Sequence, residues 1–252
     1  MKSLLLTGLL FILILPGCRK ETSILPLLQS VEKLIPMYAD SASVLLDSIQ
    51  APDELTDKDF AHWCMLCGKV TDEAATGLLP IYQWQRAQQW FTEHGTAEEQ
   101  AQIDLYLGRA YVEDGEYDKA MQIYADALQL AKEHQAYNVA GYICAYMADL
   151  YGFRDITSEC LKKREEACEF FKKAENYKSY AYSLKDLAGE WAILDSFACT
   201  IPLLQKADSI SQLLHNKNLT AAIANAFALI YEMQGKYNEA ETAYLKAIST
   251  RS

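Results

Sequence analysis

The sequence predicts an all-α protein, a right-handed solenoid of about five helical hairpins preceded by an N-terminal helix. The first observation is a period of 40 residues, at which small residues recur: Gly68, Gly108, Ala148, Ala188 and Ala228. The second is a triplet of small, aromatic and small side chains, separated by four and then three positions. Such spacings place side chains on one face of a helix. Self-similarity at a period of about 20–50 residues is typical of stacked repeats.

The first 17 residues resemble the signal peptide of a bacterial lipoprotein. Lys2 precedes an apolar run from Leu4 to Leu15, which is shorter than the roughly 20 residues that span a bilayer. The run leads into Leu-Pro-Gly-Cys, which resembles a lipobox with Cys18 as the residue that receives the lipid. We therefore expect a signal peptide over 1–17, a tether over 18–30 and a helical repeat domain over 31–252. An ordinary secretory signal or a short membrane anchor is the alternative.

The first hairpin is expected over residues 57–95, after the N-terminal helix. It matches the period least well, because Pro80 stands where the other hairpins have a small residue. Trp84 and Ala87 nevertheless keep the spacing of the triplet. A hairpin is therefore expected here despite the proline.

The hairpin over 101–134 indicates what the small residues do. Gly108 allows the partner helix to approach closely, and Tyr124, between Ala120 and Ala127, fills the space beside the crossing. Gly115 follows the first helix, at a position where a left-handed cap favours glycine. The last hairpin, over 221–250, repeats this arrangement with Ala228, Gly235, Ala240, Tyr244 and Ala247.

The two hairpins between them match less closely. Residues 181–214 carry the triplet as Thr200, Leu204 and Ala207. In 141–175 the triplet is Ala167, Phe171 and Ala174, seven residues later than the period requires. An insertion is therefore expected around Gly-Phe-Arg-Asp-Ile-Thr-Ser-Glu, at 152–159.

The pattern resembles the tetratricopeptide repeat, whose signature has Leu-Gly, then Tyr, then Ala, an aromatic residue and Ala. The standard repeat has about 34 residues, and we attribute the longer period here to second helices that run about one turn longer. Residues 38–70 are also similar to the N-terminal part of tetratricopeptide lipoproteins of the Bacteroidetes type. The matching segments are Asp-Ser-Ala at 40–42, Leu-Leu-Asp-Ser-Ile at 45–49, Leu-Thr-Asp at 55–57 and Asp-Leu-Tyr-Leu-Gly-Arg-Ala-Tyr at 104–111.

This resemblance covers residues 31–250 and implies a membrane-tethered, non-enzymatic scaffold of the cell envelope that binds other proteins. The alternative is a peptide-sensing input module of a membrane-linked regulatory system. Arg19, Lys20 and Glu21 do not form the acidic run that surface-exported lipoproteins of this group tend to carry, so we expect a periplasm-facing position.

A concave groove lined by the first helices is the expected place for a protein or peptide ligand. Arg and Tyr are the residue types that most often anchor recognition. The positions expected to face the groove are Arg109, Tyr142, Asp149, Tyr182, Lys185 and Asn225, with His62 and Lys69 in the first hairpin.

Composition argues against a nucleic-acid partner. The formal net charge is −11, and no stripe of Lys and Arg is interleaved with aromatic residues. The densest basic run, Lys162, Lys163 and Arg164, lies among glutamates at helical spacing. We interpret this run as a solvated, salt-bridged helix face.

The sequence has no motif typical of catalysis or metal binding. The four histidines are scattered, with no phosphate-binding loop, zinc-protease motif or EF-hand spacing. Cys64 and Cys67 are spaced as in redox or zinc sites, but no second pair follows at zinc spacing. We interpret both as small buried apolar residues that face the second helix. No catalytic residue, metal or cofactor is expected.

The C-terminal end is expected to be an interaction surface. Helical repeat arrays usually end in a polar-faced capping helix, whereas three residues follow the expected end of the last helix, near Ser249. Self-association, a covering partner and a longer natural chain are the alternatives. The residues expected to be exposed there are Tyr231, Met233, Tyr244, Leu245 and Ile248.

Overall fold

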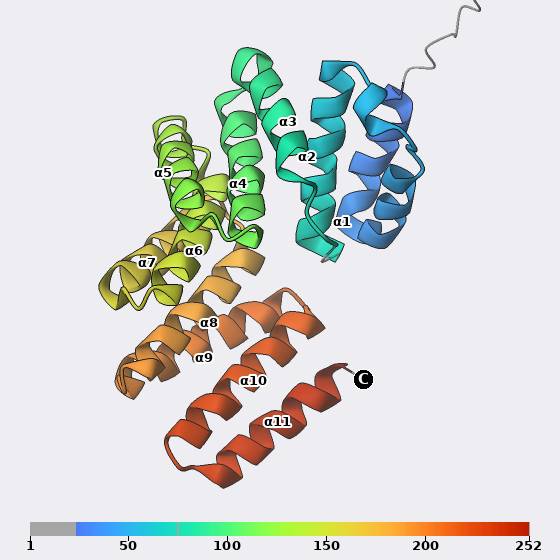
Figure 1. Ribbon diagram of the computed structural model, residues 1–252. Coiled ribbons are helices and arrows are strands. Elements are labelled where there is room, and N and C mark those ends of the chain that lie inside the picture. The colour runs from blue at the N-terminus through green and yellow to red at the C-terminus, as the bar shows by residue number, and fades with distance from the viewer. Residues whose placement is uncertain (1–23, 75, 252) are drawn as a thin grey trace, which may run out of the picture.

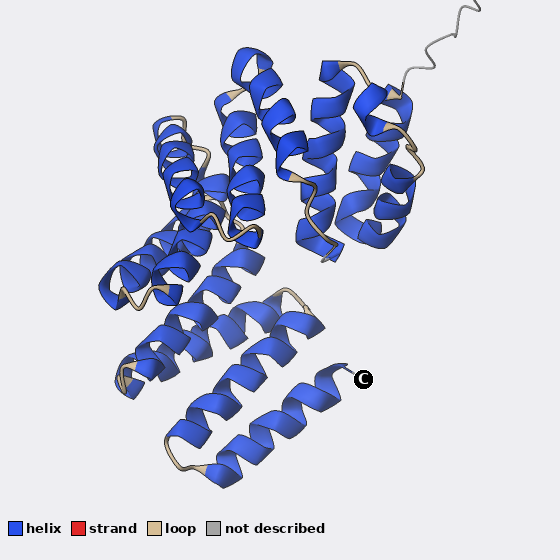
Figure 2. Cartoon of the chain, in the orientation of Figure 1, coloured by secondary structure: helices blue, strands red, loops and turns tan. Residues whose placement is uncertain are grey.

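The computed structural model describes residues 24–74 and 76–251, and every regular element in these ranges is helical (Figures 1 and 2). Five hairpins follow an N-terminal helix along a curved array, which confirms the expected fold class. The helices are α1 (Leu25–Asp47), η1 (Pro52–Glu54), α2 (Asp57–Ala74), α3 (Ile81–His94), α4 (Ala97–Glu113), α5 (Tyr117–Glu133), α6 (Tyr137–Phe153), α7 (Thr157–Lys173), α8 (Tyr177–Ile193), α9 (Phe197–Leu213), α10 (Lys217–Met233) and α11 (Tyr237–Arg251).

Helix α1 begins earlier than expected, at Leu25, so the last residues of the expected tether are helical. Leu28 and Val31 are buried there, and α1 packs against α2. Because burying these side chains stabilises the helix against the first repeat, the repeat domain extends toward the N-terminus. Pro36 lies within α1, and Tyr38 just after it has non-helical backbone angles, which mark a kink. The expected signal peptide and Cys18 lie outside the described residues.

The helices from α4 to α10 are equal in length, with 17 residues each. The expectation that only the second helices are long is therefore wrong: both helices of each hairpin share the extra length. Each of these seven helices ends in a left-handed residue, at intervals of 20 positions: Gly115, Gln135, Asp155, Glu175, Asp195, His215 and Gly235. The residue after it donates its N–H to a carbonyl five residues back, as in a Schellman cap.

The expected insertion in the third hairpin is absent, because α6 and α7 have the same length and spacing as their neighbours. The true triplet in α7 is Cys160, Arg164 and Ala167, so an arginine takes the place of the aromatic residue. Phe171 resembles the aromatic residue of a triplet because it also fills a gap between the two helices, beside Gly141 of α6. A Cβ at Gly141 would lie 2.8 Å from the ring of Phe171. The two helices of a hairpin run antiparallel. Gly141, seven residues before Ala148 on α6, therefore lies beside Phe171, seven residues after Arg164 on α7.

The close crossing of the second hairpin lies where the period places it, whereas Gly68 of the first hairpin makes its close approach to Tyr106 of α4, in the next repeat. A Cβ added at Gly108 would lie 2.2 Å from Tyr124 Cε1, and Tyr124 is fully buried. The small residues of the later first helices, Ala148, Ala188 and Ala228, are also fully buried. Small side chains therefore set how closely the helices of a hairpin approach each other.

No helix in the described ranges 24–74 and 76–251 has the length and hydropathy needed to cross a membrane. In the last described hairpin, Leu245 and Ile248 are 59% and 66% exposed and Met233 is half exposed, in line with the expected exposure of these three side chains. Tyr231 and Tyr244 are partly buried. The hydroxyl of Tyr244 donates a hydrogen bond to Glu232 at 2.9 Å.

Candidate binding site on the concave face

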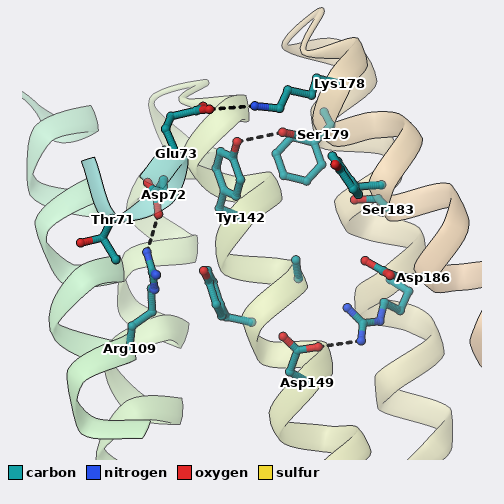
Figure 3. Close-up of a pocket in the computed structure, with 15 residues that line it drawn as sticks. Thr71, Asp72, Glu73, Arg109, Tyr142, Asp149, Lys178, Ser179, Ser183 and Asp186 are labelled. Carbon is teal, nitrogen blue, oxygen red and sulfur yellow. Dashed lines mark hydrogen bonds and ion pairs between the residues drawn. The ribbon is translucent and has the colours of Figure 1, made fainter. Parts of the chain in front are cut away.

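The first helices line the inside of the curve. Helix α2 contacts α4, α4 contacts α6, and α8 contacts α10, while α6 and α8 approach each other less closely. A pocket of about 400 Å³ opens where they separate (Figure 3). Its walls come from the C-terminal turn of α2, from α4, α6 and α8, and from two side chains of α7. Four repeats therefore contribute to one site.

Arg109 of α4 is the cation on the α2 side of the pocket. It forms an ion pair with Asp72, whose other oxygen accepts a hydrogen bond from the hydroxyl of Tyr106 at 2.8 Å. The guanidinium also lies over the ring of Tyr146, 5.0 Å from its centroid. Burial raises the pKa of Asp72 above its ordinary value, although Arg109 opposes the shift. This wall is a partly desolvated ion pair held by aromatic rings.

Arg164 of α7 reaches between α6 and α8 at the floor of the pocket. Its side chain is 12% exposed, and it donates to Asp149 of α6 at 2.6 Å and to Glu190 of α8 at 3.4 Å. Burial raises the pKa of Asp149 against the opposing charge of Arg164. Within the basic run, Arg164 therefore contradicts the expectation of a solvated face. Lys163 is also largely buried, and pairs with Glu166 at 2.8 Å.

Two contacts connect α8 to the opposite side of the pocket. Tyr142 of α6 and Ser179 of α8 share a hydrogen bond at 2.8 Å. Lys178 of α8 donates to Glu73 of α2 at 2.9 Å, across 105 positions of sequence. Figure 3 shows this second pair at the edge of the pocket. We call it the rim pair, because it joins the first repeat to the fourth across the groove.

Family models of the tetratricopeptide repeat match residues 107–135 and 220–252. The chain carries tetratricopeptide repeats. These two ranges overlap the hairpins with the clearest small, aromatic and small triplets, so the expected resemblance to the repeat is confirmed. The similarity to Bacteroidetes lipoproteins is not tested by these matches and stays a prediction. No match was found among curated protein sequences.

Solved structures of other repeat proteins are similar over most of the chain. BtubC (BKLC) from P. vanneervenii has 16% sequence identity, a TM-score of 0.62, and 92% of both chains covered. The apo form of RapI has 14% identity and a TM-score of 0.62, with 90% of this chain and 97% of that chain covered. A Rap protein complexed with competence and sporulation factor has 16% identity and a TM-score of 0.60, with 90% and 65% covered. At such identities the likeness shows the fold alone.

The repeat geometry brings together four of the six expected groove residues. Arg109, Tyr142, Asp149 and Tyr182 line the 400 Å³ pocket. Lys185 lines a neighbouring pocket between α8 and α10. Asn225, on α10, is partly buried and lies outside the residues that line either pocket.

The first tetratricopeptide hairpin contributes neither of its expected residues to the pocket. His62 packs on Trp90 of α3, with ring centroids 5.1 Å apart. Lys69 turns toward α1, where its ammonium lies 3.7 Å from Glu32. Because α1 adds a helix beside the first repeat, a position that faces the groove in later repeats faces α1 here.

The sequence interpretation missed several pocket residues, above all Arg164, Glu73 and Lys178. An uninterrupted period of 40 would have made Arg164 equivalent to the buried aromatic residues Trp84 and Tyr124. A charged residue at a position that is otherwise buried between two helices would then have marked Arg164 as unusual. The rim pair has no comparable sequence signal, because only the curvature of the array brings its partners together.

The paired thiols of the first repeat are packing residues. Cys64 is buried, with its sulfur 3.8 Å from the carbonyl of Gln83 at the start of α3, and Cys67 is partly buried. Burial raises the pKa of both thiols well above the ordinary value. Among the described residues, no group of three or more His, Cys, Asp or Glu side chains is placed to hold a metal ion.

Proposed function

We propose that the protein is a membrane-tethered, non-enzymatic scaffold whose concave pocket binds an extended segment of a partner protein or peptide. The observation that carries the proposal is the pocket between α2, α4, α6 and α8, which mixes aromatic rings with hydrogen-bonding groups. An extended peptide presents N–H and C=O groups alternately and side chains on both sides. Ser183 and Tyr182 can meet such groups, while Tyr146 offers an aromatic surface.

The fold supports an interaction role. Tetratricopeptide arrays provide long concave surfaces for binding, and one of the similar solved structures is a Rap protein complexed with competence and sporulation factor. Tyr and Arg anchors in desolvated pockets carry most of the binding energy of many interfaces. The side chain of Arg109 is 14% exposed and is held by Tyr146 and Asp72, so its guanidinium is already positioned before a partner arrives.

Photo-crosslinking tests the location of the ligand. A benzoylphenylalanine placed at Tyr182, which lines the pocket, is expected to form a covalent adduct with the partner in the native envelope. Tyr82 on α3 is exposed and lies outside the pocket, so the same substitution there is the matched control. The proposal predicts an adduct at 182 that is absent at 82. The same adducts at both positions, or none at 182, would contradict it.

The proposed membrane tether rests on the lipobox-like segment ending in Cys18. Cys18→Ala is expected to abolish labelling by an alkyne fatty acid, whereas Cys199→Ala, at an exposed cysteine of the repeat domain, should leave it unchanged. Equal labelling of the two variants would rule out lipidation at Cys18. For the proposed periplasm-facing position, protease should cleave the chain only after the outer membrane is permeabilised.

The rim pair favours a second candidate function, a peptide-sensing module. An exposed ion pair contributes at most about 1 kcal/mol, so a ligand in the pocket could displace Glu73 from Lys178 and alter the curvature. Glu73→Gln should therefore increase the distance between fluorophores on α2 and α8. Glu32→Gln, which breaks the pair with Lys69 between adjacent helices, is the control. If added ligand and Glu73→Gln both left the distance unchanged, the sensing function would be wrong.

Self-association through the last hairpin is proposed from its exposed apolar side chains. Leu245 and Ile248 are exposed large apolar side chains of α11. Burying such side chains in a partner copy would remove apolar surface from water. Light scattering should show a concentration-dependent mass that Leu245→Glu reduces to that of a monomer. A wild type that is monomeric at every concentration would exclude this contact.

A further inference from the structure

A second pocket adjoins the first along the groove. It lies between α8 and α10, measures about 330 Å³ and shares Arg164 and Asp186 with the first pocket. The pocket exists because small residues occupy positions at which the preceding repeat has larger ones. Gly189 and Ala226 are equivalent to Asp149 and Asp186, 40 residues earlier. The two pockets are therefore consecutive sections of one groove, and a segment bound in the first can continue into the second.

The second pocket is apolar on the side away from the first. Ile193 of α8 is 70% exposed, and Leu229 and Met233 of α10 are each more than half exposed. All three line the pocket. Large apolar side chains that gather at a concave surface mark a place where a ligand removes them from water. This section of the groove fits a large apolar side chain.

The charged side chains of the groove indicate which group of the ligand lies next to that apolar side chain. Five carboxylates line the two pockets, against four cationic side chains: Asp72, Glu73, Asp149, Asp186 and Glu190 against Arg109, Arg164, Lys178 and Lys185. Four of the carboxylates each pair with a cation of their own.

Glu190 is the remaining carboxylate. Arg164 donates to Glu190 from both Nε and Nη2, each at the longer distance of 3.4 Å, and makes its shorter contact, at 2.6 Å, to Asp149. The side chain of Glu190 is 19% exposed and borders the apolar section. A carboxylate that is largely removed from water and shares its cation favours an added positive charge. The complementary ligand group at this point is an ammonium or guanidinium.

We propose that the pocket between α8 and α10 is a specificity subsite for a basic residue of an extended peptide and a large apolar residue within two positions of it. The cation of the peptide lies at Glu190, and the apolar side chain packs against Ile193, Leu229 and Met233. This subsite rests on the proposed function, because the rest of the peptide occupies the first pocket. It determines which segments bind there, by charge and by apolar area.

The probe for this subsite is a display library of random heptapeptides, selected on the immobilised full chain. Enriched peptides are expected to contain Lys or Arg within two positions of Leu, Ile, Met or Phe, in either order. A synthetic copy of the most enriched peptide should bind about tenfold more weakly to Glu190→Gln and to Leu229→Ser. Glu169→Gln removes the same charge from an exposed position of α7 and should change the affinity less than twofold. In the Glu190→Gln variant the side-chain amide oxygen can still accept from Arg164, and unchanged melting temperatures verify that the variants fold.

The outcomes separate the subsite from the function on which it rests. Enrichment of peptides without the basic and apolar pair, or binding that both Glu190→Gln and Leu229→Ser leave unchanged, overturns the subsite while peptide binding stands. A competitor effect of a second copy of the chain, seen as weaker peptide binding at higher protein concentration, would assign the pocket to self-association and also overturn it. No enrichment of any peptide would overturn both, and the crosslink at Tyr182 reports independently on the first pocket.

Discussion

A single added methyl group should have opposite effects at two helical glycines of this chain. Gly108→Ala puts a Cβ 2.2 Å from Tyr124 Cε1 and 2.7 Å from Cδ1, whereas carbon atoms in contact are normally about 3.5–4.0 Å apart. Tyr124 is fully buried and stacks on Tyr146, with centroids 6.3 Å apart, so its ring has little room to move. At Gly189 of α8 a Cβ would meet nothing within 4 Å.

The magnitudes follow from two opposing terms. Replacing a helical glycine by alanine stabilises a helix by about 1 kcal/mol, and this term acts alone at Gly189. Overpacking costs about 1–3 kcal/mol, so Gly108→Ala should be destabilised by up to about 2 kcal/mol after the helix term is subtracted. For a chain of this size each kcal/mol shifts the melting temperature by about 2–4 °C. The melting temperatures of the two variants should therefore differ by several degrees.

Thermal unfolding measures the difference, and hydrogen exchange locates it. Repeat arrays can unfold in parts, so the faster exchange in Gly108→Ala should be concentrated in α4 and α5. If Gly108→Ala proved as stable as Gly189→Ala, the close crossing at Tyr124 would not set the spacing of the hairpin.

Three further predictions concern individual side chains. Burial raises the pKa of Asp104 to about 6 despite a hydrogen bond from Gln88. The folded state therefore holds this proton more tightly and loses stability as the pH rises from about 4 to about 6, so Asp104→Asn should stabilise by about 2–3 kcal/mol at pH 7.5 and by only about 0.5 kcal/mol at pH 4. Urea midpoints at both pH values measure this, and an equal effect at both would contradict it. Glu175→Gly, at a left-handed turn with φ 55°, should stabilise by about 0.5–1 kcal/mol in thermal melts, and a lower melting temperature would contradict it. Maleimide should label the exposed Cys199 in the native protein but Cys64 only after unfolding, and rapid native labelling of Cys64 would mean that the thiol is accessible.

The repeat could be predicted from the sequence, but not every structural feature that results from it. The small residues at 68, 108, 148, 188 and 228 were sufficient for the hairpins, because a close helix crossing excludes larger side chains. The turns were harder to place, since five of the seven left-handed positions hold residues other than glycine. Their strain is offset by the Schellman hydrogen bonds and by packing of the helices on either side, which no local motif records.

Some residues of the candidate site could likewise be predicted from the sequence, and others could not. Arg109, Tyr142, Asp149 and Tyr182 could be placed from the period alone, because equivalent positions of successive first helices face the same groove. Lys69 could not, since its ammonium turns toward α1 and lies near Glu32. Arg164 was missed because Phe171, beside Gly141, imitates the expected triplet. The contacts of Lys178 depend on the accumulated curvature of three repeats, which is a property of the array as a whole.

The rim pair also has a consequence for the order in which the chain folds during synthesis. Nearly all helix contacts join neighbours in sequence, so each hairpin can form soon after it leaves the ribosome, and such local contacts form quickly. Glu73 is made long before Lys178, and their contact requires α8 to be in place. We therefore expect the groove to stay open along its edge while α2 to α7 are already folded, and to acquire its final width only when the fourth hairpin is complete.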